Sequence, residues 1–290
     1  MSVASRIRHS FVGRSVRKAL HAAYCAQHRN GSPVKYRLPG GVEVELFPEG
    51  EVVEFLWVQR FFEKTELALV SAYLKRGMKA FDVGANIGLY SILSERLVGD
   101  EGAVWAVEPS TESFARLRRN LSLNECSRVH AERVALASQA NRSLQLTSDS
   151  GFGDAYRYLL PPDETAQLGQ TTELVPVTTL DRFAEENAIE SIDFLKVDVE
   201  GGEYLVFEGG RRLLQSSPGL CIMFESDPEW CRRARARQQD AFDLLRGLGF
   251  ELHVWRNKAR EWVADERSLL AAGSVWACRD ARRLPVLGRS

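Results

Sequence analysis

The chain alternates short apolar runs with segments that carry apolar residues at helical spacing. Apolar runs at 80–83 and 103–107 are each followed by such a segment, at 87–98 and 111–123. Further apolar runs predict strands at 129–135, 192–197, 220–224, 250–255 and 274–278. Repetition of a strand followed by a helix is typical of a parallel, doubly wound sheet. We therefore predict an α/β fold with a mostly parallel, seven-stranded sheet.

An extension precedes the first strand of this sheet. Apolar residues at 42–47 and 52–57 flank the turn sequence Pro48-Glu49-Gly50, and this arrangement predicts a hairpin. Residues 65–76 then have helical spacing, and the pattern stops at Gly77. The sequence thus predicts a helical and hairpin extension on the N-terminal side of the main sheet.

The turn after the first strand indicates a cofactor. Asp82 ends the strand, Gly84 and Gly88 lie in the turn, and Glu108 ends the next strand. A dinucleotide fold has G-x-G-x-x-G there, so that its backbone contacts a pyrophosphate. This turn lacks the paired glycines, and its carboxylate repels a pyrophosphate but suits the ammonium and sulfonium charges of S-adenosylmethionine. We therefore predict S-adenosylmethionine as the cofactor, with Glu108 accepting hydrogen bonds from both ribose hydroxyls. The alternative is that Asp82 and Gly88 merely mark a strand-to-helix turn.

The strand at 192–197 ends in charged residues. Strand alternation puts Lys196, Asp198 and Glu200 on one side. Ligands of open α/β sheets bind outside the carboxyl ends of the strands, where the strand order reverses. We predict that Asp198 and Glu200 position an acceptor hydroxyl near the methyl group and that one of them takes up its proton. The structural alternative is a Lys196–Asp198 ion pair, with Glu200 or Glu203 capping the next helix. We prefer the functional interpretation for Asp198, leave both open for Glu200, and expect Glu203 to be structural.

Several segments together resemble a known family. The segments are FDVGANIGLYSI, WAVEPS with LRRNLSLN, TTLDRF, and DFLKVDVEGGEYLVFEGG. In this order they resemble the FkbM-type S-adenosylmethionine-dependent methyltransferases over about residues 57–226. Gly202 and Phe207 stand where the family more often has Ala and Leu, which leaves the cofactor assignment intact.

The resemblance has implications for fold, activity and site. It implies a class I methyltransferase fold, which is Rossmann-like, with a last strand inserted antiparallel beside the fifth. It also implies methylation of a hydroxyl on a sugar or small metabolite. It places Glu63 near the methionine amino group, although an acid favoured by the dipole of the next helix is an equal alternative. The predicted cofactor-binding residues are Glu63, Asp82, Gly84, Ala85, Asn86, Gly88 and Glu108, and the predicted catalytic residues are Lys196, Asp198 and Glu200.

Composition limits the number of domains and the class of partner. With 290 residues and 44% hydrophobic content, the chain suits one catalytic domain. We place that domain at 37–283, after a basic extension at 1–36 and before a tail at 284–290. A net charge of −1 argues against a nucleic-acid protein held by bulk electrostatics. We therefore expect a small-molecule or carbohydrate acceptor.

The cysteines and the apolar runs indicate a compartment. The chain has 5 cysteines, an odd number, without C-x-x-C spacing, which is typical of reduced thiols. No apolar signal-peptide region follows the basic N-terminus, and no apolar run approaches the roughly 18 residues that span a bilayer. We expect a soluble, unprocessed, cytoplasmic protein.

The N-terminal segment is basic. Between Met1 and Val42 there is no acid. Its apolar residues recur near helical spacing, so an amphipathic helix on an anionic surface is one interpretation. The preferred alternative is a solvated helix that packs on the domain or frays. The basic side chains are Arg6, Arg8, Arg14, Arg17, Lys18, Arg29, Lys35 and Arg37.

A long polar segment is a candidate lid over the substrate. Residues 148–172 are rich in Gly, Asp and Pro, and a loop of this length inside a domain is usually functional or disordered. A lid and a plain surface excursion are equally supported. The side chains that a lid offers to an acceptor are Phe152, Tyr156, Arg157 and Tyr158.

Other functions are less well supported by the motifs. A nicotinamide-dependent oxidoreductase requires the G-x-G-x-x-G that the Gly84–Gly88 turn lacks. A non-catalytic module that binds the adenosyl cofactor is a further alternative, disfavoured by the presence of Asp82, Glu108 and Asp198. A nucleic-acid methyltransferase typically carries an Asn/Asp-Pro-Pro-aromatic segment after strand four, where this chain has Asp-Val-Glu-Gly. We expect no metal, because Asp198 and Glu200 alone make a weak divalent site.

Overall fold

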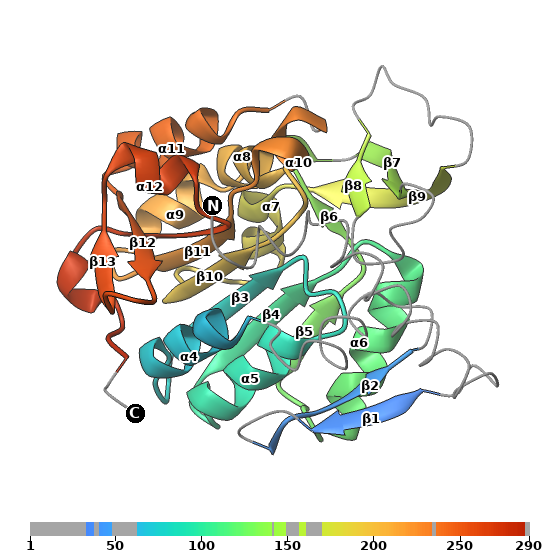
Figure 1. Cartoon of the computed structure of the whole chain (residues 1–290). Coiled ribbons are helices and arrows are strands. Elements are labelled where there is room, and N and C mark those ends of the chain that lie inside the picture. Colours follow the sequence, from blue (N-terminus) through green and yellow to red (C-terminus); the bar gives the residue numbers. More distant parts are fainter. Residues whose placement is uncertain are drawn as a thin grey trace, which may run out of the picture.

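The computed structural model describes residues 33–37, 41–47, 63–140, 142–148, 157–160, 170–233 and 236–287. Its centre is an eight-stranded sheet with helices against both faces (Figure 1). The strands are β3 (Lys79–Val83), β4 (Ala103–Val107), β5 (Val129–Glu132), β10 (Phe194–Val197), β11 (Cys221–Glu225), β12 (Glu251–Arg256), β13 (Glu261–Val263) and β14 (Ser274–Cys278).

The order of the strands across the sheet is β13-β12-β14-β11-β10-β3-β4-β5. The five strands from β11 to β5 pair in parallel, whereas β14 runs antiparallel to both β11 and β12. The predicted doubly wound, mostly parallel sheet is therefore confirmed, as is a last strand inserted beside the fifth. The eighth strand, β13, was not predicted; it pairs with β12 and brings Trp255 opposite Trp262.

The three predicted helices are present, with shifts of up to three residues at their ends. The predicted helix at 87–98 begins two residues later, because Gly88 has a φ of 91° and serves as its N-cap. The helix at 111–123 starts where the Ser110 side chain accepts a hydrogen bond from the Ser113 N–H. The α-helices in the described ranges are α4 (Lys64–Tyr73), α5 (Leu89–Val98), α6 (Thr111–Leu123), α7 (Leu180–Glu186), α8 (Glu203–Glu208), α9 (Arg211–Ser216), α10 (Pro228–Arg233), α11 (Gln238–Gly247) and α12 (Glu266–Leu270).

Alternation along the strands supplies a core on each face of the main sheet. Phe81 and Val83 of β3 lie in one apolar cluster with side chains from α7, α8, α9 and α11. Ala80 of the same strand lies in another, with side chains from α4 and α5. A parallel sheet covered on both faces buries both sets of side chains, so its strands are almost continuously apolar. The exceptions, Asp82 and Lys196, therefore indicate a site.

A second sheet, which was not predicted, lies beside the carboxyl ends of the parallel strands (Figure 1). It consists of β6 (Ala135–Leu136), β7 (Arg142–Ser148), β8 (Arg157–Leu159) and β9 (Thr171–Thr178), in the order β6-β9-β7-β8. Two predictions need correction here. The predicted strand at 129–135 divides into β5 and β6, which belong to different sheets. The segment at 148–172, predicted as a loop, contains β8 and the start of β9, because both pair with β7.

The N-terminal hairpin differs from the predicted one in its partner. The predicted strand at 42–47 is present as β2 (Glu43–Leu46), and it pairs antiparallel with β1 (Val34–Arg37) on its N-terminal side. The predicted partner at 52–57 lies outside the described residues. The hairpin packs beside α6 (Figure 1), where Asn120 accepts a hydrogen bond from the Glu45 N–H (2.7 Å) and donates one to the Ile87 carbonyl (2.9 Å).

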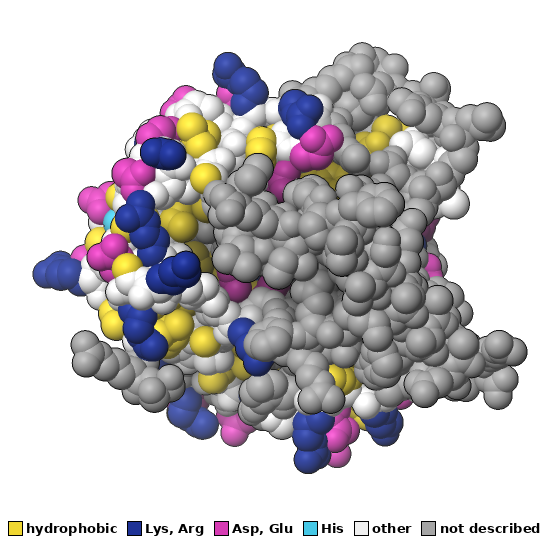
Figure 2. Space-filling model, viewed as in Figure 1, with side chains coloured by type: hydrophobic (Ala, Val, Ile, Leu, Met, Phe, Trp, Pro, Cys, Tyr) yellow, Lys and Arg dark blue, Asp and Glu magenta, His cyan; other side chains and the backbone are white. Residues whose placement is uncertain are grey.

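The described surface carries charges of both signs. Lys and Arg side chains are interspersed with Asp and Glu over the described part of the face in Figure 2. Among the described residues, no helix combines the length and the apolar character needed to cross a membrane.

Replacing Asn120 tests whether the hairpin is fixed to the domain as described. The Asn120 side chain is fully buried, so Asn120→Ala leaves the Glu45 N–H and the Ile87 carbonyl without their partner. We expect the free energy of unfolding in urea to fall by about 1 to 3 kcal/mol. Gln239→Ala, which removes a surface hydrogen bond to Asp243, is the control and should change it by less than about 0.5 kcal/mol. Equal effects of the two substitutions would contradict the proposed role of Asn120.

Candidate active site

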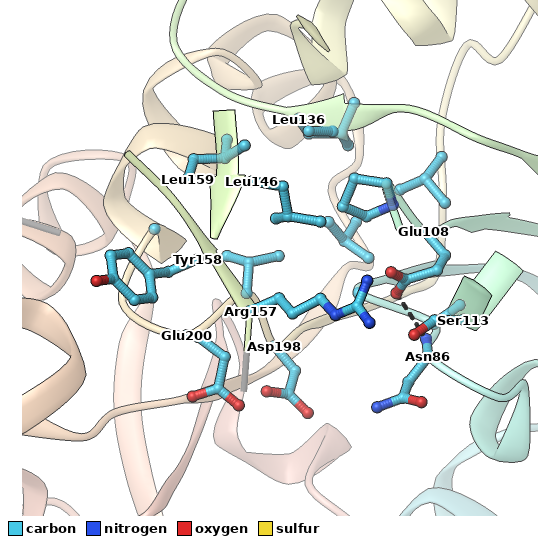
Figure 3. A pocket seen from close by; sticks show the side chains of 18 of the residues that line it. Asn86, Glu108, Ser113, Leu136, Leu146, Arg157, Tyr158, Leu159, Asp198 and Glu200 are labelled. Atoms are coloured by element: carbon cyan, nitrogen blue, oxygen red, sulfur yellow. Dashed lines mark hydrogen bonds between the residues drawn. The ribbon is translucent and has the colours of Figure 1, made fainter. Parts of the chain in front are cut away.

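A cavity of about 320 Å³ opens at the carboxyl ends of β3, β4 and β10 (Figure 3). This is the edge at which open α/β sheets bind their ligands, and the volume is within the range of small-molecule sites. All but two of the ten predicted site residues line it; the two exceptions are Asp82 and Gly88. The predicted residues at the cavity wall are Glu63, Gly84, Ala85, Asn86, Glu108, Lys196, Asp198 and Glu200.

The turn after β3 forms the floor between two strand ends. Gly84, Asn86 and Gly88 all have a positive φ, of 75°, 49° and 91°. A Cβ atom on Gly84 would lie 1.8 Å from the carbonyl oxygen of Asp198, so only glycine fits there. The turn after β3 and the end of β10 are therefore in direct backbone contact.

Glu108 is held rigidly at the end of β4. One carboxylate oxygen accepts a hydrogen bond from the Asn86 N–H (2.9 Å) and the other accepts one from the Ser110 N–H (3.0 Å). Burial raises the pKa of Glu108 to about 7, although these two hydrogen bonds lower it. The two backbone donors fix both oxygens at the wall, where their other lone pairs can accept from hydroxyl groups of a ligand.

Lys196 joins the ends of β3 and β10. Its Nζ atom lies 3.4 Å from Asp82 Oδ1 and 3.3 Å from Asp198 Oδ2, and it donates to the Gly84 carbonyl (3.1 Å). Burial by itself lowers the pKa of Lys196, but the carboxylates of Asp198 and Asp82 raise it above its ordinary value. The ammonium is therefore charged, and the ion pair considered as the structural alternative is present. It coexists with Asp198 at the wall of the cavity.

Asp82 lies one layer behind the wall. It is 3% exposed, and in addition to Lys196 it accepts a hydrogen bond from the Ser91 hydroxyl (2.6 Å). The structure thus places this predicted cofactor-binding carboxylate beneath Lys196, so that its charge acts on the cavity through the ammonium group. A direct contact between Asp82 and a ligand stays a prediction.

Glu63 reaches the cavity from the start of α4. Its carboxylate accepts a hydrogen bond of 2.5 Å from the Tyr90 hydroxyl. Burial and the nearby Asp198 carboxylate raise the pKa of Glu63 to about 7. A carboxylate at this wall suits a cationic ligand group, and the contact with a methionine amino group that the resemblance implied stays a prediction.

Two glutamates, Glu200 and Glu203, lie in or just after the glycine turn that follows β10, and they have different surroundings. Glu203 Oε1 accepts hydrogen bonds from the Val199 N–H (3.1 Å) and the Gly201 N–H (3.2 Å), so its predicted structural role is confirmed. Glu200 lines the cavity and has a positive φ of 56°. Both interpretations of Glu200 had been left open, and the structure places it at the wall.

Glu225 joins this group from β11 and was missed by the sequence analysis. Ligand oxygens of Asp198, Glu200 and Glu225 all lie within 4.8 Å of one another. Burial and the neighbouring carboxylates, Glu200 first, raise the pKa of Glu225 well above its ordinary value. The pattern that would have revealed it is the one that identified Glu108, an acid at the end of an apolar strand.

The second sheet supplies the opposite wall, which is largely apolar. Leu136, Leu146 and Leu159 face the cavity from β6, β7 and β8 (Figure 3). Arg157 of β8 extends towards Glu108 and forms hydrogen bonds to the Ser110 hydroxyl and to Glu112 (3.1 Å). Arg157 and Tyr158, which the sequence assigned to a lid, thus lie on a strand whose residues line the cavity.

Comparisons with known proteins agree with the predicted family. The family model described as "Methyltransferase FkbM domain" matches residues 82–252. "Methyltransferase 1" of Beauveria bassiana is 28% identical over 144 residues, which cover 44% of this chain. "31-O-demethyl-FK506 methyltransferase FkbM" of Streptomyces tacrolimicus is 26% identical over 262 residues, which cover 82% of this chain. The chain spans 56% of the length of the first relative and 93% of the second.

Solved structures of methyltransferases resemble this chain at low sequence identity. One is an O-methyltransferase from Bacillus cereus, solved in complex with SAH. It matches with a TM-score of 0.46 and 14% sequence identity, and the match covers 78% of this chain and 88% of that chain.

The raised pKa of Glu108 predicts how stability depends on pH. The carboxyl titrates near 4.5 when unfolded and about 7 when folded. The folded state therefore binds more protons between these values, and the stabilisation is complete below pH 4.5 and lost as the pH rises through about 7. We expect the unfolding free energy to fall between about pH 5 and about pH 8, by on the order of 2 kcal/mol more in the parent than in Glu108→Gln.

The control for this measurement is Glu132→Gln, an exposed acid at the end of the neighbouring strand β5. It should retain the full pH dependence of the parent. Glu63 and Glu203 have pKa values raised in the same direction, so a smaller dependence remains in Glu108→Gln. If Glu108→Gln and the parent have the same pH dependence, the assigned titration of Glu108 is wrong.

Proposed function

The chain belongs to the FkbM methyltransferase family, and we propose that it transfers the methyl group of S-adenosylmethionine to a hydroxyl on a sugar or small metabolite. The single observation that carries this proposal is the position of Glu108. Its two oxygens, held by backbone N–H groups beside the Gly84 turn, face a cavity whose other end carries Asp198. A cofactor end and an acceptor end thus share one cavity.

The residues at the cofactor end fit an adenosyl sulfonium ligand chemically. Glu108 offers carboxylate lone pairs to the two ribose hydroxyls. Glu63 offers an acid to the ammonium group of the methionine part, at the wall reached from α4. The turn at 84–88 brings backbone close to the ligand without the paired glycines that a pyrophosphate requires. These features favour S-adenosylmethionine over a nicotinamide cofactor.

The acceptor end suits an alcohol. When bound, S-adenosylmethionine would supply an electrophilic methyl group, and cleavage of its methyl–sulfur bond would leave S-adenosylhomocysteine. Asp198 accepts the proton of the acceptor hydroxyl as the new oxygen–carbon bond forms, and Lys196 keeps that carboxylate in position. Holding the acceptor oxygen in line with the methyl group supplies much of the remaining rate enhancement. The name of the Streptomyces relative, which denotes methylation at an oxygen, supports oxygen as the methylated atom.

The shape of the cavity supports a small acceptor. The leucines of the second sheet offer an apolar surface to the adenine ring or to an apolar face of the acceptor. A small molecule or a carbohydrate fits these dimensions, and this class of acceptor is part of the proposal. Contact of the basic N-terminal segment with an anionic surface stays a prediction, because residues 1–32 lie outside the described residues.

Binding measurements test the cofactor assignment. We expect calorimetric titration to show saturable binding of S-adenosylmethionine and S-adenosylhomocysteine and no binding of NAD. Glu108→Ala, which removes the acceptor of the ribose hydroxyls, should weaken both adenosyl ligands by about 10- to 100-fold. The control Glu132→Gln should bind like the parent. Binding of NAD alone would instead indicate an oxidoreductase, and no binding of any of the three would contradict the assigned cofactor site.

Activity measurements test the role of Asp198. With labelled methyl donor and a panel of hydroxylated acceptors, Asp198→Asn should retain affinity for S-adenosylmethionine and lose about 100-fold or more in kcat, because an amide cannot accept the proton. Asp243→Asn, at an exposed position on α11, is the matched control and should keep the parent rate. Unchanged turnover in Asp198→Asn would restrict Asp198 to its ion pair with Lys196.

A further inference from the structure

Three carboxylates from two strand ends converge at the acceptor end of the cavity. Asp198 and Glu200 follow β10, and Glu225 ends β11. One oxygen of each lies within 4.8 Å of the others. The Asp198 and Glu200 side chains lie next to each other at the wall of the cavity (Figure 3). Asp198 and Glu200 are therefore accessible to a ligand that enters from the cavity, and Glu225 lies against them on the side of β11.

Glu225 provides an independent indication that this group binds something. Its Oε2 atom is shielded from solvent and accepts no hydrogen bond from the described part of the chain. Native proteins seldom leave a buried carboxylate oxygen without a donor or a cation, because the lost solvation is not recovered. The position of Glu225 therefore calls for a partner that the described residues do not provide.

The nearby charges point to a cation as that partner. Within the described ranges, Lys196 is an ammonium in contact with this group, and it is already shared between Asp82 and Asp198, at 3.4 Å and 3.3 Å. The charge of Lys196 is thus divided between two carboxylates, and the Glu225 carboxylate lies next to one of them. Carboxylates this close to one another repel unless protons or a cation balance them.

We propose that Asp198, Glu200 and Glu225 bind one divalent cation, Mg²⁺ or Mn²⁺, at the acceptor end of the cavity. Oxygen ligands alone, with no imidazole or thiolate in the group, are the donor set that these hard cations prefer. No metal site was expected from the sequence, because only two of the three carboxylates, Asp198 and Glu200, were recognised there. The third carboxylate comes from a strand that is 25 residues further along the chain than Glu200.

The site has a consequence for the reaction that rests on the proposed function. A divalent cation held by these three residues binds an acceptor hydroxyl through its oxygen and lowers the pKa of that hydroxyl. The proton then passes to a carboxylate of the group or to water, and the acceptor oxygen is held in place for bond formation. This arrangement favours an acceptor with a second oxygen next to the reacting hydroxyl, because two oxygens can bind one cation together.

Titration with Mn²⁺ alone tests the site without a methyl acceptor. The full-length chain is first freed of metal with a chelator, and free Mn²⁺ is then followed by electron paramagnetic resonance. We expect one saturable site per chain with a Kd on the order of 10 µM. Glu225→Gln should weaken it by at least about tenfold, because it removes one charged ligand. Glu229→Gln, an exposed acid on α10, is the matched control and should bind Mn²⁺ like the parent.

Two further measurements keep the outcomes distinct. Thermal unfolding verifies that each variant is folded, and Glu200→Gln serves as a second variant with the same expected loss if Glu225→Gln is unfolded. Absence of saturable Mn²⁺ binding in the parent, or parent-like binding in a folded Glu225→Gln, overturns the site and leaves protons as the balancing charge. S-adenosylmethionine binding is measured in parallel: its presence without Mn²⁺ binding refutes the metal site alone, and its absence with Mn²⁺ binding refutes the proposed function alone.

Discussion

The buried ammonium of Lys196 is the interaction on which the site depends. It lies between Asp82 on β3 and Asp198 after β10, and it also donates to the Gly84 carbonyl. Three segments distant in sequence are thereby fixed at one point of the sheet edge. Removing one member of such a buried pair usually costs about 3 to 5 kcal/mol, because the other charge is left uncompensated. The same contact that stabilises the two strand ends therefore also aims Asp198 into the cavity.

Around this cation the cavity is strongly acidic for an enclosed site. Burial raises the pKa values of Glu63 and Glu108 to about 7, so part of their charge depends on what occupies the cavity. A cationic ligand favours the ionised forms, and an empty cavity favours the protonated ones. Ionisable groups with strongly shifted pKa values are common at functional sites. The acidic wall therefore suits both the proposed sulfonium cofactor and the proposed divalent cation.

The two sheets contribute different kinds of side chain to the cavity. The carboxyl ends of the main sheet hold the charged residues on a rigid frame, whereas the small sheet from β6 to β9 provides the apolar wall and Arg157. Arg157 also connects the two parts, through Ser110 and Glu112 beside β4. A shared fold does not fix the acceptor, which depends on the side chains that line the cavity.

The sequence by itself determined seven strands of the main sheet and the first helices between them, and with these the positions of Glu108 and Asp198, because periodicity and an acid at a strand end are local properties. It did not reveal β7 and β8, the pairing of β2 with β1, or the arrival of Glu225 beside Asp198. Each of these depends on pairing between distant segments, such as β7 with β9 from Arg142 to Val177. Only the tertiary structure decided them, because side-chain contacts across a sheet follow from register and strand order, which no short window of sequence contains.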